Sequence, residues 1–362
     1  MSTIVLVHGI AQEQLAADTL ESHWLPALAG GVRTYGNTDL ADRLWRHSAP
    51  GDITVRMAYY GHHFLDHTAQ GPTTPEKLDP DQTALAEQLA AAWLHAAAER
   101  ASDPRDRAEA NRGLAELTNE PYDAQGPRAA IRPAMNGLAR LRWFAPLGLG
   151  LAGRFVYRAL SQVSRYLTDD TVRRTAQDLV LAHIDPTTRL VIGHSLGSVI
   201  AYEALHRTNH PTALLTLGSP LGLRNIIYER LHPQPPHVPP TLTRWHNIVD
   251  RDDLVAAHLD LRPYFPPPPV PPSSPPPPPP STTDPNPTTR PTTSPNASPA
   301  ASSPKHSPPP MNSHVMNPSG SVRMGIRNRT AMISQPVVMC VREDRGRYEA
   351  QAGPARGLQP RW

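Results

Sequence analysis

Residues 189–205 read RLVIGHSLGSVIAYEAL, and this stretch joins the pattern of a buried strand to that of a helix. Leu190 to Ile192 form a short apolar run that suits a buried parallel strand, and the apolar residues from Val199 to Leu205 suit a helix. Between them lies Gly-His-Ser-Leu-Gly, with a glycine two positions from Ser195 on either side. Glycine permits the close backbone approach that a tight turn requires. The stretch therefore predicts that Ser195 is held on a sharp corner between a strand and a helix.

Short apolar runs elsewhere in the chain predict the rest of a sheet. Further strands are expected at residues 3–7, 53–60, 213–217 and 242–249. Helical patterns alternate with the strands, notably at residues 169–183 and 196–207. This alternation predicts an α/β fold, with an open and mostly parallel sheet that carries helices on both faces.

Residues 61–168 separate the second strand from the strand before Ser195, and they are too many for a simple connection. Their alanine-rich, helical pattern predicts a helical cap insertion. The apolar piece at residues 143–153 (WFAPLGLGLAG) could line an acyl pocket, contact a membrane surface peripherally, or form an ordinary buried helical hairpin. It is too short to span a bilayer, which takes about 20 apolar residues.

Composition divides the chain near residue 262. Half of its 44 prolines fall within residues 263–310, including an unbroken run from Pro275 to Pro280. Such a segment lacks backbone donors and apolar side chains, so we expect it to be disordered. The folded domain is therefore expected at residues 1–262, and residues 311–362 form a poorly defined tail.

Charge and cysteine content exclude several classes. The net charge of +3 over 362 residues gives no argument for a nucleic-acid partner. A single cysteine, Cys340, excludes an intramolecular disulfide, and the first residues show no secretory signal pattern. We expect a cytoplasmic location.

Four motifs together resemble the α/β-hydrolase superfamily. They are His8-Gly9 after the first strand, the GHSLG turn, Gly218-Ser219-Pro220-Leu221 after a later strand, and WHNIVDRDDLV at residues 245–255. The nearest resemblance is to lipase- and esterase-like bacterial serine hydrolases that share motifs with GPI-inositol deacylases. It covers residues 3 to about 258, interrupted by the cap.

The resemblance implies a serine nucleophile and an oxyanion hole. Ser195 would be the nucleophile, its hydroxyl activated by an imidazole base. The backbone N–H groups of Leu196 and Ile10 would stabilise the oxyanion that forms when the serine attacks. His8 and His194 would shape the loop and the turn rather than act as the base.

The resemblance also implies an acid in the loop after residue 249. Asp253 matches the family's acid and ranks first, Asp250 is the alternative acid, and Asp252 is expected to be solvated. The acids lack histidines at ligand spacing, so we expect no metal and no other cofactor.

The triad histidine cannot be assigned from the sequence. The last strand-like run, residues 336–341, has no histidine after it, and His258 and His314 are weak candidates. A frameshift is one hypothesis. If the codons of residues 323–334 end mostly in C or G, reading them two bases later gives DGHPQPHSHDL, which resembles the family's histidine-bearing tail.

Two functions follow from these expectations. The first is a serine hydrolase that cleaves a small-molecule or lipid ester through an acyl-enzyme. The alternative is a catalytically impaired scaffold without its histidine, which acts in binding or interaction. In that alternative the proline-rich tail would bind a partner, as PxxP segments bind aromatic grooves.

Overall fold

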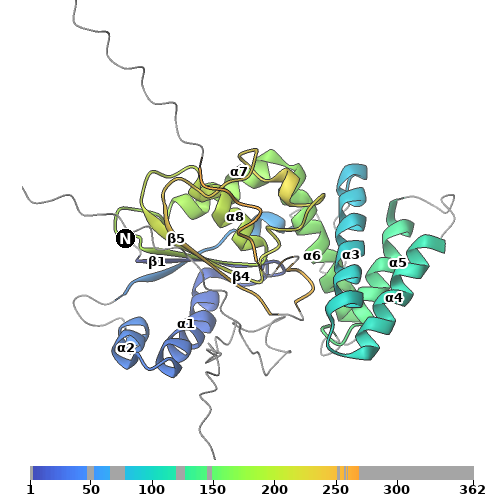
Figure 1. The fold of residues 1–362 in the computed structure, drawn as a ribbon, viewed down its shortest axis with the longest axis horizontal. Coiled ribbons are helices and arrows are strands. Elements are labelled where there is room, and N and C mark those ends of the chain that lie inside the picture. The colour runs from blue at the N-terminus through green and yellow to red at the C-terminus, as the bar shows by residue number, and fades with distance from the viewer. Residues whose placement is uncertain are drawn as a thin grey trace, which may run out of the picture. The chain divides into compact units, whose positions relative to one another are not determined.

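The computed structural model describes residues 3–46, 53–65, 78–119, 127–144, 149–250, 253–256, 258 and 260–268. Five strands form one sheet in the order β2-β1-β3-β4-β5, and every neighbouring pair is parallel (Figure 1). The strands are β1 (Ile4–Val7), β2 (Val55–Ala58), β3 (Leu190–His194), β4 (Thr212–Leu217) and β5 (Leu242–Ile248). The predicted parallel α/β sheet is confirmed, because all five predicted strands lie in it.

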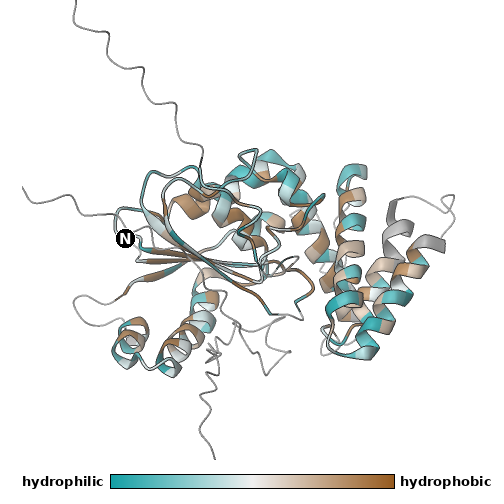
Figure 2. Cartoon of the chain, in the orientation of Figure 1, coloured by the Kyte–Doolittle hydropathy of each residue, from teal (hydrophilic) through white to brown (hydrophobic). Residues whose placement is uncertain are grey.

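Apolar side chains cover both faces of the central strands. All four residues of β1 are buried, and the hydropathy colouring shows the helix after β3 as largely hydrophobic (Figure 2). A strand that is buried on both faces needs apolar residues at successive positions rather than at alternate ones. The run IVLV of β1 fits this requirement.

Helices pack on both faces of the sheet. The buried side chains of α1 (Ala17–Thr34) and α2 (Thr38–Arg46) join one core with Leu6, Met57 and Ile192. Helix α8 (Leu196–Leu205), with α7 (Asp170–Leu181) packed against it, contributes to a second core that contains Val5 and Val191. Neighbouring residues of a strand point to opposite faces, so the two cores lie on opposite sides of the sheet.

Four helices occupy most of the predicted insertion: α3 (Pro80–Arg100), α4 (Pro104–Asn119), α5 (Pro127–Arg140) and α6 (Leu149–Thr168). Asp79 caps α3 by accepting a hydrogen bond from the N–H of Gln82, while the Gln82 side chain accepts from the N–H of Asp79. This reciprocal pair defines where α3 begins. Helices α3, α4 and α5 pack on one another, and α6 packs on α3, α5 and α7.

Two 3-10 helices complete the described elements, η1 (Gly61–Phe64) after β2 and η3 (Tyr228–Arg230) between β4 and β5. The packed chain continues past residue 262, the predicted end of the domain. Phe265 is buried, and the carbonyl of Pro266 accepts a hydrogen bond from Val238. The rest of the predicted proline-rich segment, the tail and the proposed frameshift lie outside the described residues. No helix in the described ranges is long and apolar enough to cross a membrane.

Candidate functional site

Ser195 lies on the corner between β3 and α8 with φ of 51° and ψ of −125°. This is a backbone conformation that residues other than glycine rarely adopt, and holding it costs about 1–3 kcal/mol. Ser195 is the N-cap residue of α8, yet its side chain makes no capping hydrogen bond. Serine usually caps a helix through its hydroxyl. The hydroxyl of Ser195 is therefore not used to stabilise the helix that it precedes.

The two glycines of the turn are required by close packing. A Cβ on Gly193 would lie 2.7 Å from the carbonyl oxygen of Gly197 and from Cα of Ser198. A Cβ on Gly197 would overlap the carbonyl oxygens of Val7 and His8. Each contact involves backbone, which cannot rotate away as a side chain can. The spacing of glycines around Ser195 thus follows from the approach of α8 to β1 and β3.

Ser195 is nearly buried, with 6% of its surface exposed. Within the part of the chain that the structure describes, no residue forms a hydrogen bond with its Oγ. The loop after β1 lies beside it, since a Cβ on Gly9 would be 3.1 Å from Cβ of Ser195. Cβ of Ser195 thus lies against the backbone of this loop.

Two backbone N–H groups, on Leu196 and in the loop beside Ser195, have no hydrogen-bond partner in the described part of the chain. Leu196 is the first residue of α8, and the N–H groups of a first helical turn have no partner inside the helix. Neither Leu196 nor Ile10, which follows Gly9, donates its backbone N–H to any described residue. These are the two donors that the sequence predicted for an oxyanion hole.

His8 is held by hydrogen bonds at both ring nitrogens. Its Nδ1 lies 2.7 Å from the carbonyl oxygen of Gly9, so Nδ1 carries the proton and donates it. Its Nε2 accepts from the N–H of Tyr60 at 3.2 Å. Burial lowers the pKa of His8 to about 4, although the bond to Gly9 opposes this shift. A neutral ring with no vacant nitrogen cannot take a proton from Ser195.

His194 packs into the same corner. A Cβ on Gly9 would lie 2.8 Å from Nδ1 of His194, and the ring meets Trp24 edge-on with centroids 6.1 Å apart. Burial lowers the pKa of His194 to about 4. No hydrogen bond links this ring to Ser195, so its contacts fit a role in shaping the turn.

Asp253 is buried and is oriented by backbone donors. Its Oδ1 accepts from the N–H groups of Val255 at 2.9 Å and Ala256 at 3.4 Å. Its Oδ2 lies 2.6 Å from where a Cβ on Gly218 would stand, and Gly218 has φ of +52°. The same Cβ would be 3.9 Å from Cδ2 of His194. Asp253 therefore lies at the carboxyl end of β4, close to the side chain that precedes Ser195.

The environment of Asp253 disfavours its charge. Burial raises the pKa of Asp253 to about 6, and the nearby charge of Asp250 adds to this shift. Hydrogen bonds from Val255 and Ala256 and the charge of Arg100 oppose it. Arg100 also donates to the backbone carbonyl of Asp253 at 3.2 Å. The alternative acid, Asp250, accepts the N–H of Asp253 on its carbonyl at 3.1 Å. Asp252 lies outside the described residues.

His258 is engaged with an aromatic neighbour. Its Nε2 lies 3.1 Å from the hydroxyl of Tyr264, and the two rings stack with centroids 4.7 Å apart. Burial first, and then Arg100 and Arg224, lower the pKa of His258. No hydrogen bond joins this ring to Ser195 or to Asp253. His314 lies outside the described residues, so the triad histidine stays unassigned.

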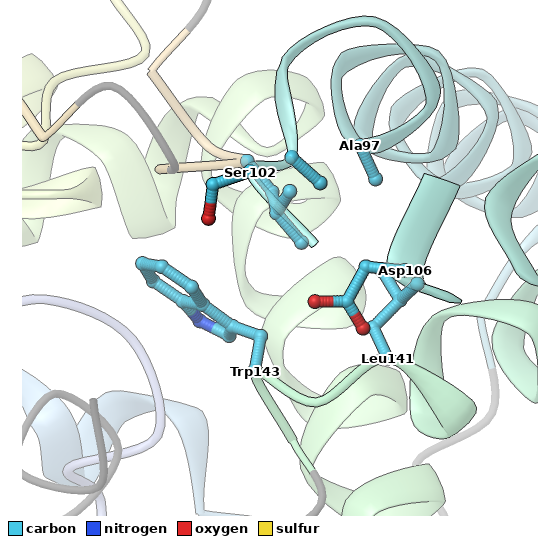
Figure 3. Close-up of a pocket in the computed structure, with 7 residues that line it drawn as sticks. Ala97, Ser102, Asp106, Leu141 and Trp143 are labelled. Atoms are coloured by element: carbon cyan, nitrogen blue, oxygen red, sulfur yellow. The ribbon is translucent and has the colours of Figure 1, made fainter. Parts of the chain in front are cut away.

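The apolar piece at residues 143–153 is described at both ends. Trp143 lines a small hollow with Asp106 from α4 and with Leu254, the residue after Asp253 (Figure 3). Phe144 is buried, whereas Leu151 on α6 is 60% exposed. Phe144 at one end thus packs inside the domain, while at the other end Leu151 faces outward and Ala152 is buried.

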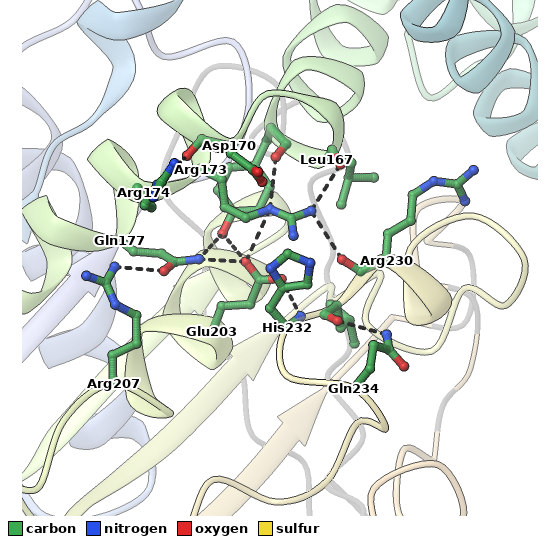
Figure 4. Close-up of polar contacts among 12 residues, drawn as sticks. Leu167, Asp170, Arg173, Arg174, Gln177, Glu203, Arg207, Arg230, His232 and Gln234 are labelled. Atoms are coloured by element: carbon green, nitrogen blue, oxygen red, sulfur yellow. Dashed lines mark hydrogen bonds and ion pairs between the residues drawn. The ribbon is translucent and has the colours of Figure 1, made fainter.

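A buried polar network anchors the outer side of α8, and the sequence analysis did not identify it (Figure 4). Glu203 accepts from the hydroxyl of Tyr166 at 2.6 Å, from Gln177 at 2.8 Å and from the N–H of His232 at 2.9 Å. Arg173 lies 3.8 Å from the same carboxylate. The sequence indicated this network only through Glu203, a charged residue inside the apolar run VIAYEAL. The network ties α6 and α7 to the helix that follows Ser195.

No group of three or more metal-ligating side chains is present among the described residues. No protein-family model matches the chain, and neither a curated protein nor a solved structure matches it.

Proposed function

We propose that this chain is a serine hydrolase of the α/β-hydrolase type that cleaves carboxylic esters through an acyl-enzyme. One observation carries the proposal: Ser195 is held with a positive φ on the β3–α8 corner, beside the loop that carries Ile10, and the N–H groups of Leu196 and Ile10 have no partner among the described residues. A strained serine, a hydroxyl that no described residue binds and nearby backbone donors together form the parts that acyl transfer needs.

The reaction would proceed in two halves. As Oγ of Ser195 bonds to the ester carbonyl carbon, a base takes its proton and the carbonyl electrons move onto oxygen. The N–H groups of Leu196 and Ile10 would stabilise that oxyanion. When it collapses, the bond to the alcohol breaks and the base returns the proton to the leaving oxygen. Water then attacks the acyl-enzyme in the same way and releases the acid.

Asp253 would orient the base and stabilise its protonated form. This role requires an ionised carboxylate. Because the pKa of Asp253 is raised to about 6, the carboxylate is mostly ionised above that pH. Lipid-like or acyl esters are the proposed substrates, on the strength of the resemblance to lipases and esterases.

A second candidate is a scaffold with the same fold that binds a ligand or partner and catalyses poorly. A specific observation favours it: no imidazole of the described chain forms a hydrogen bond with Ser195 or Asp253. The impaired chain would still offer its proline-rich segment to a partner.

A fluorophosphonate probe distinguishes the two candidates, because it reacts only with an activated hydroxyl. We expect the full chain to be labelled and Ser195→Ala to be unlabelled. Labelling that persists in Ser195→Ala would place the nucleophile elsewhere. An unlabelled parent chain that is folded by circular dichroism would favour the scaffold.

A further inference from the structure

The loop between β1 and α1 carries one of the two proposed oxyanion donors, and its backbone is strained. Ala11 has φ of 58°, a left-handed conformation that alanine seldom adopts. Such a conformation persists only when the surrounding structure holds it. Contacts with the rest of the fold must therefore hold the loop in place.

Gln162 of α6, in the helical insertion, provides that contact. The N–H of Ala11 donates to Oε1 of Gln162 at 2.8 Å, across 151 residues of sequence. Nε2 of Gln162 donates to Oε2 of Glu13 at 2.8 Å. The backbone N–H can only donate and a carboxylate accepts, so both partners require the same orientation of the amide. Gln162 and Glu13 are each only 5% exposed.

Helix α6 holds Glu13 at a second point. Arg158 lies one helical turn before Gln162, and its NH1 is 3.2 Å from Oε1 of Glu13. The two oxygens of Glu13 are thus bound by two side chains of one helix face. On the other side, the hydroxyl of Tyr59 donates to the carbonyl of Glu13 at 3.1 Å.

The peptide groups on both sides of Ile10 are fixed by these and neighbouring bonds. The carbonyl of Gly9 accepts from Nδ1 of His8 at 2.7 Å, and the carbonyl of Ile10 accepts from Gln12 at 3.2 Å. Oε1 of Gln162 accepts the hydrogen bond from the N–H of Ala11. The N–H of Ile10 is consequently the one donor of these two peptide groups that has no partner among the described residues.

We infer that Gln162 is a positioning residue: it holds the loop at Ala11 so that the N–H of Ile10 stays aimed beside Ser195, and it thereby couples α6 to the reaction site. This inference rests on the proposed hydrolase function. It gives the insertion a task in catalysis that does not require contact with the substrate.

The test compares two buried glutamines. Gln162→Met removes both hydrogen bonds and keeps the length of the side chain. Gln177→Met is the matched control: Gln177 is 4% exposed, and the change removes its hydrogen bonds with Glu203, Tyr166 and Arg207. We expect Gln162→Met to slow labelling of Ser195 by a fluorophosphonate by about 10- to 100-fold, mainly in the bond-forming step rather than in reversible binding. Gln177→Met should lower the unfolding midpoint and leave the labelling rate within about twofold.

An exchange of the two side chains adds a rescue. Gln162→Glu alone sets two carboxylates against each other, and labelling should slow. Combined with Glu13→Gln, the new glutamate again accepts from Ala11, and the new glutamine donates to it and accepts from Arg158. The double variant should recover most of the rate. Failure to recover, in a chain as stable as the parent, would overturn the inference.

Amide hydrogen exchange separates this inference from the proposed function. Peptides that cover residues 8–13 should exchange faster in Gln162→Met than in the parent, and at the parental rate in Gln177→Met. Equal exchange in all three proteins overturns the positioning role, whether or not Ser195 is labelled. An unlabelled parent would instead count against the hydrolase, while faster exchange in Gln162→Met would still show that Gln162 holds the loop.

Discussion

Gly197, in the first turn of α8, lies directly against the carbonyl oxygen of His8 at the end of β1, so closely that a Cβ on Gly197 would overlap this oxygen. The contact sets the distance between the helix that begins after Ser195 and the loop that carries Ile10. Only glycine, whose side chain is a hydrogen atom, therefore fits at position 197 without changing the geometry of the site.

The first prediction concerns this contact. Gly197→Ala must push α8 away from backbone that cannot yield, which should destabilise the fold by about 1–3 kcal/mol and abolish labelling of Ser195. Gly30→Ala in α1 is the matched control, because a Cβ there meets no atom of the described residues within 4 Å and alanine favours a helix. That variant should be neutral or more stable by up to about 1 kcal/mol in urea unfolding. Equal stabilities of the two variants would contradict the packing argument.

The second prediction uses the strain at Ser195. Glycine adopts a positive φ freely, so Ser195→Gly should be more stable than Ser195→Ala by about 1 kcal/mol, and neither should react with a fluorophosphonate. Because the side chain of Ser195 makes no cap bond, no such bond is lost in either variant. Thermal unfolding of the three proteins measures the difference. A glycine variant no more stable than the alanine variant would show that the corner is unstrained.

The sheet could be predicted because its signals are local. Each strand is a short apolar run, and the glycines around Ser195 mark a turn whose packing demands them. Helix α1 was not predicted, since it contains Pro26 and the pair Gly30-Gly31, residues that disfavour helix interiors. Packing on the sheet overrides that preference. The short helix α2 was not predicted either.

The polar contacts that hold the site could not be predicted, because their partners are far apart in the chain. Gln162 and Ala11 are separated by 151 residues, and neither stands in a recognisable motif. The candidate acid was easier to rank, because Asp253 lies in a motif after β5. The histidine had no such context, and the described residues do not supply one.

The third prediction follows from the raised pKa of Asp253, about 6 against an ordinary 3.8. Well below pH 3.8 the carboxyl is protonated in both folded and unfolded chains. As the pH rises from about 4 to 6, Asp253 ionises in the unfolded chain before it ionises in the folded one, which favours the unfolded chain. By pH 7 this difference lowers the free energy of unfolding by about 3 kcal/mol at most. Asp253→Asn keeps an acceptor for Val255 and carries no charge. It should therefore be more stable than the parent at pH 7 and equal to it near pH 4.

The measurement compares the free energy of unfolding of Asp253→Asn with that of the parent at each pH. His8 and His194, whose pKa values are lowered to about 4, stabilise the fold less as the pH falls from 6.5 to 4. Their effect has the opposite sign but is common to both proteins, so it cancels in the difference. Asp81→Asn, at an exposed position in the first turn of α3, is the control and should change stability little at either pH. A difference for Asp253→Asn that does not vary between pH 4 and 7 would contradict the burial argument.

The last prediction concerns the base, which decides between the enzyme and the scaffold. Loss of one triad member usually leaves a residual rate about 10³–10⁴-fold above the rate in water, because the oxyanion donors and substrate binding remain. If the full chain lacks its histidine, it should hydrolyse a short p-nitrophenyl ester feebly, and free imidazole in solution should increase the part of the rate that depends on Ser195. Ser195→Ala measures the direct reaction of imidazole with the ester, which must be subtracted. His258→Ala should change neither rate, since its ring is bonded to Tyr264. A chain that is fully active without imidazole, and whose rate collapses in His258→Ala or His314→Ala, would refute the lost-base hypothesis and identify the base.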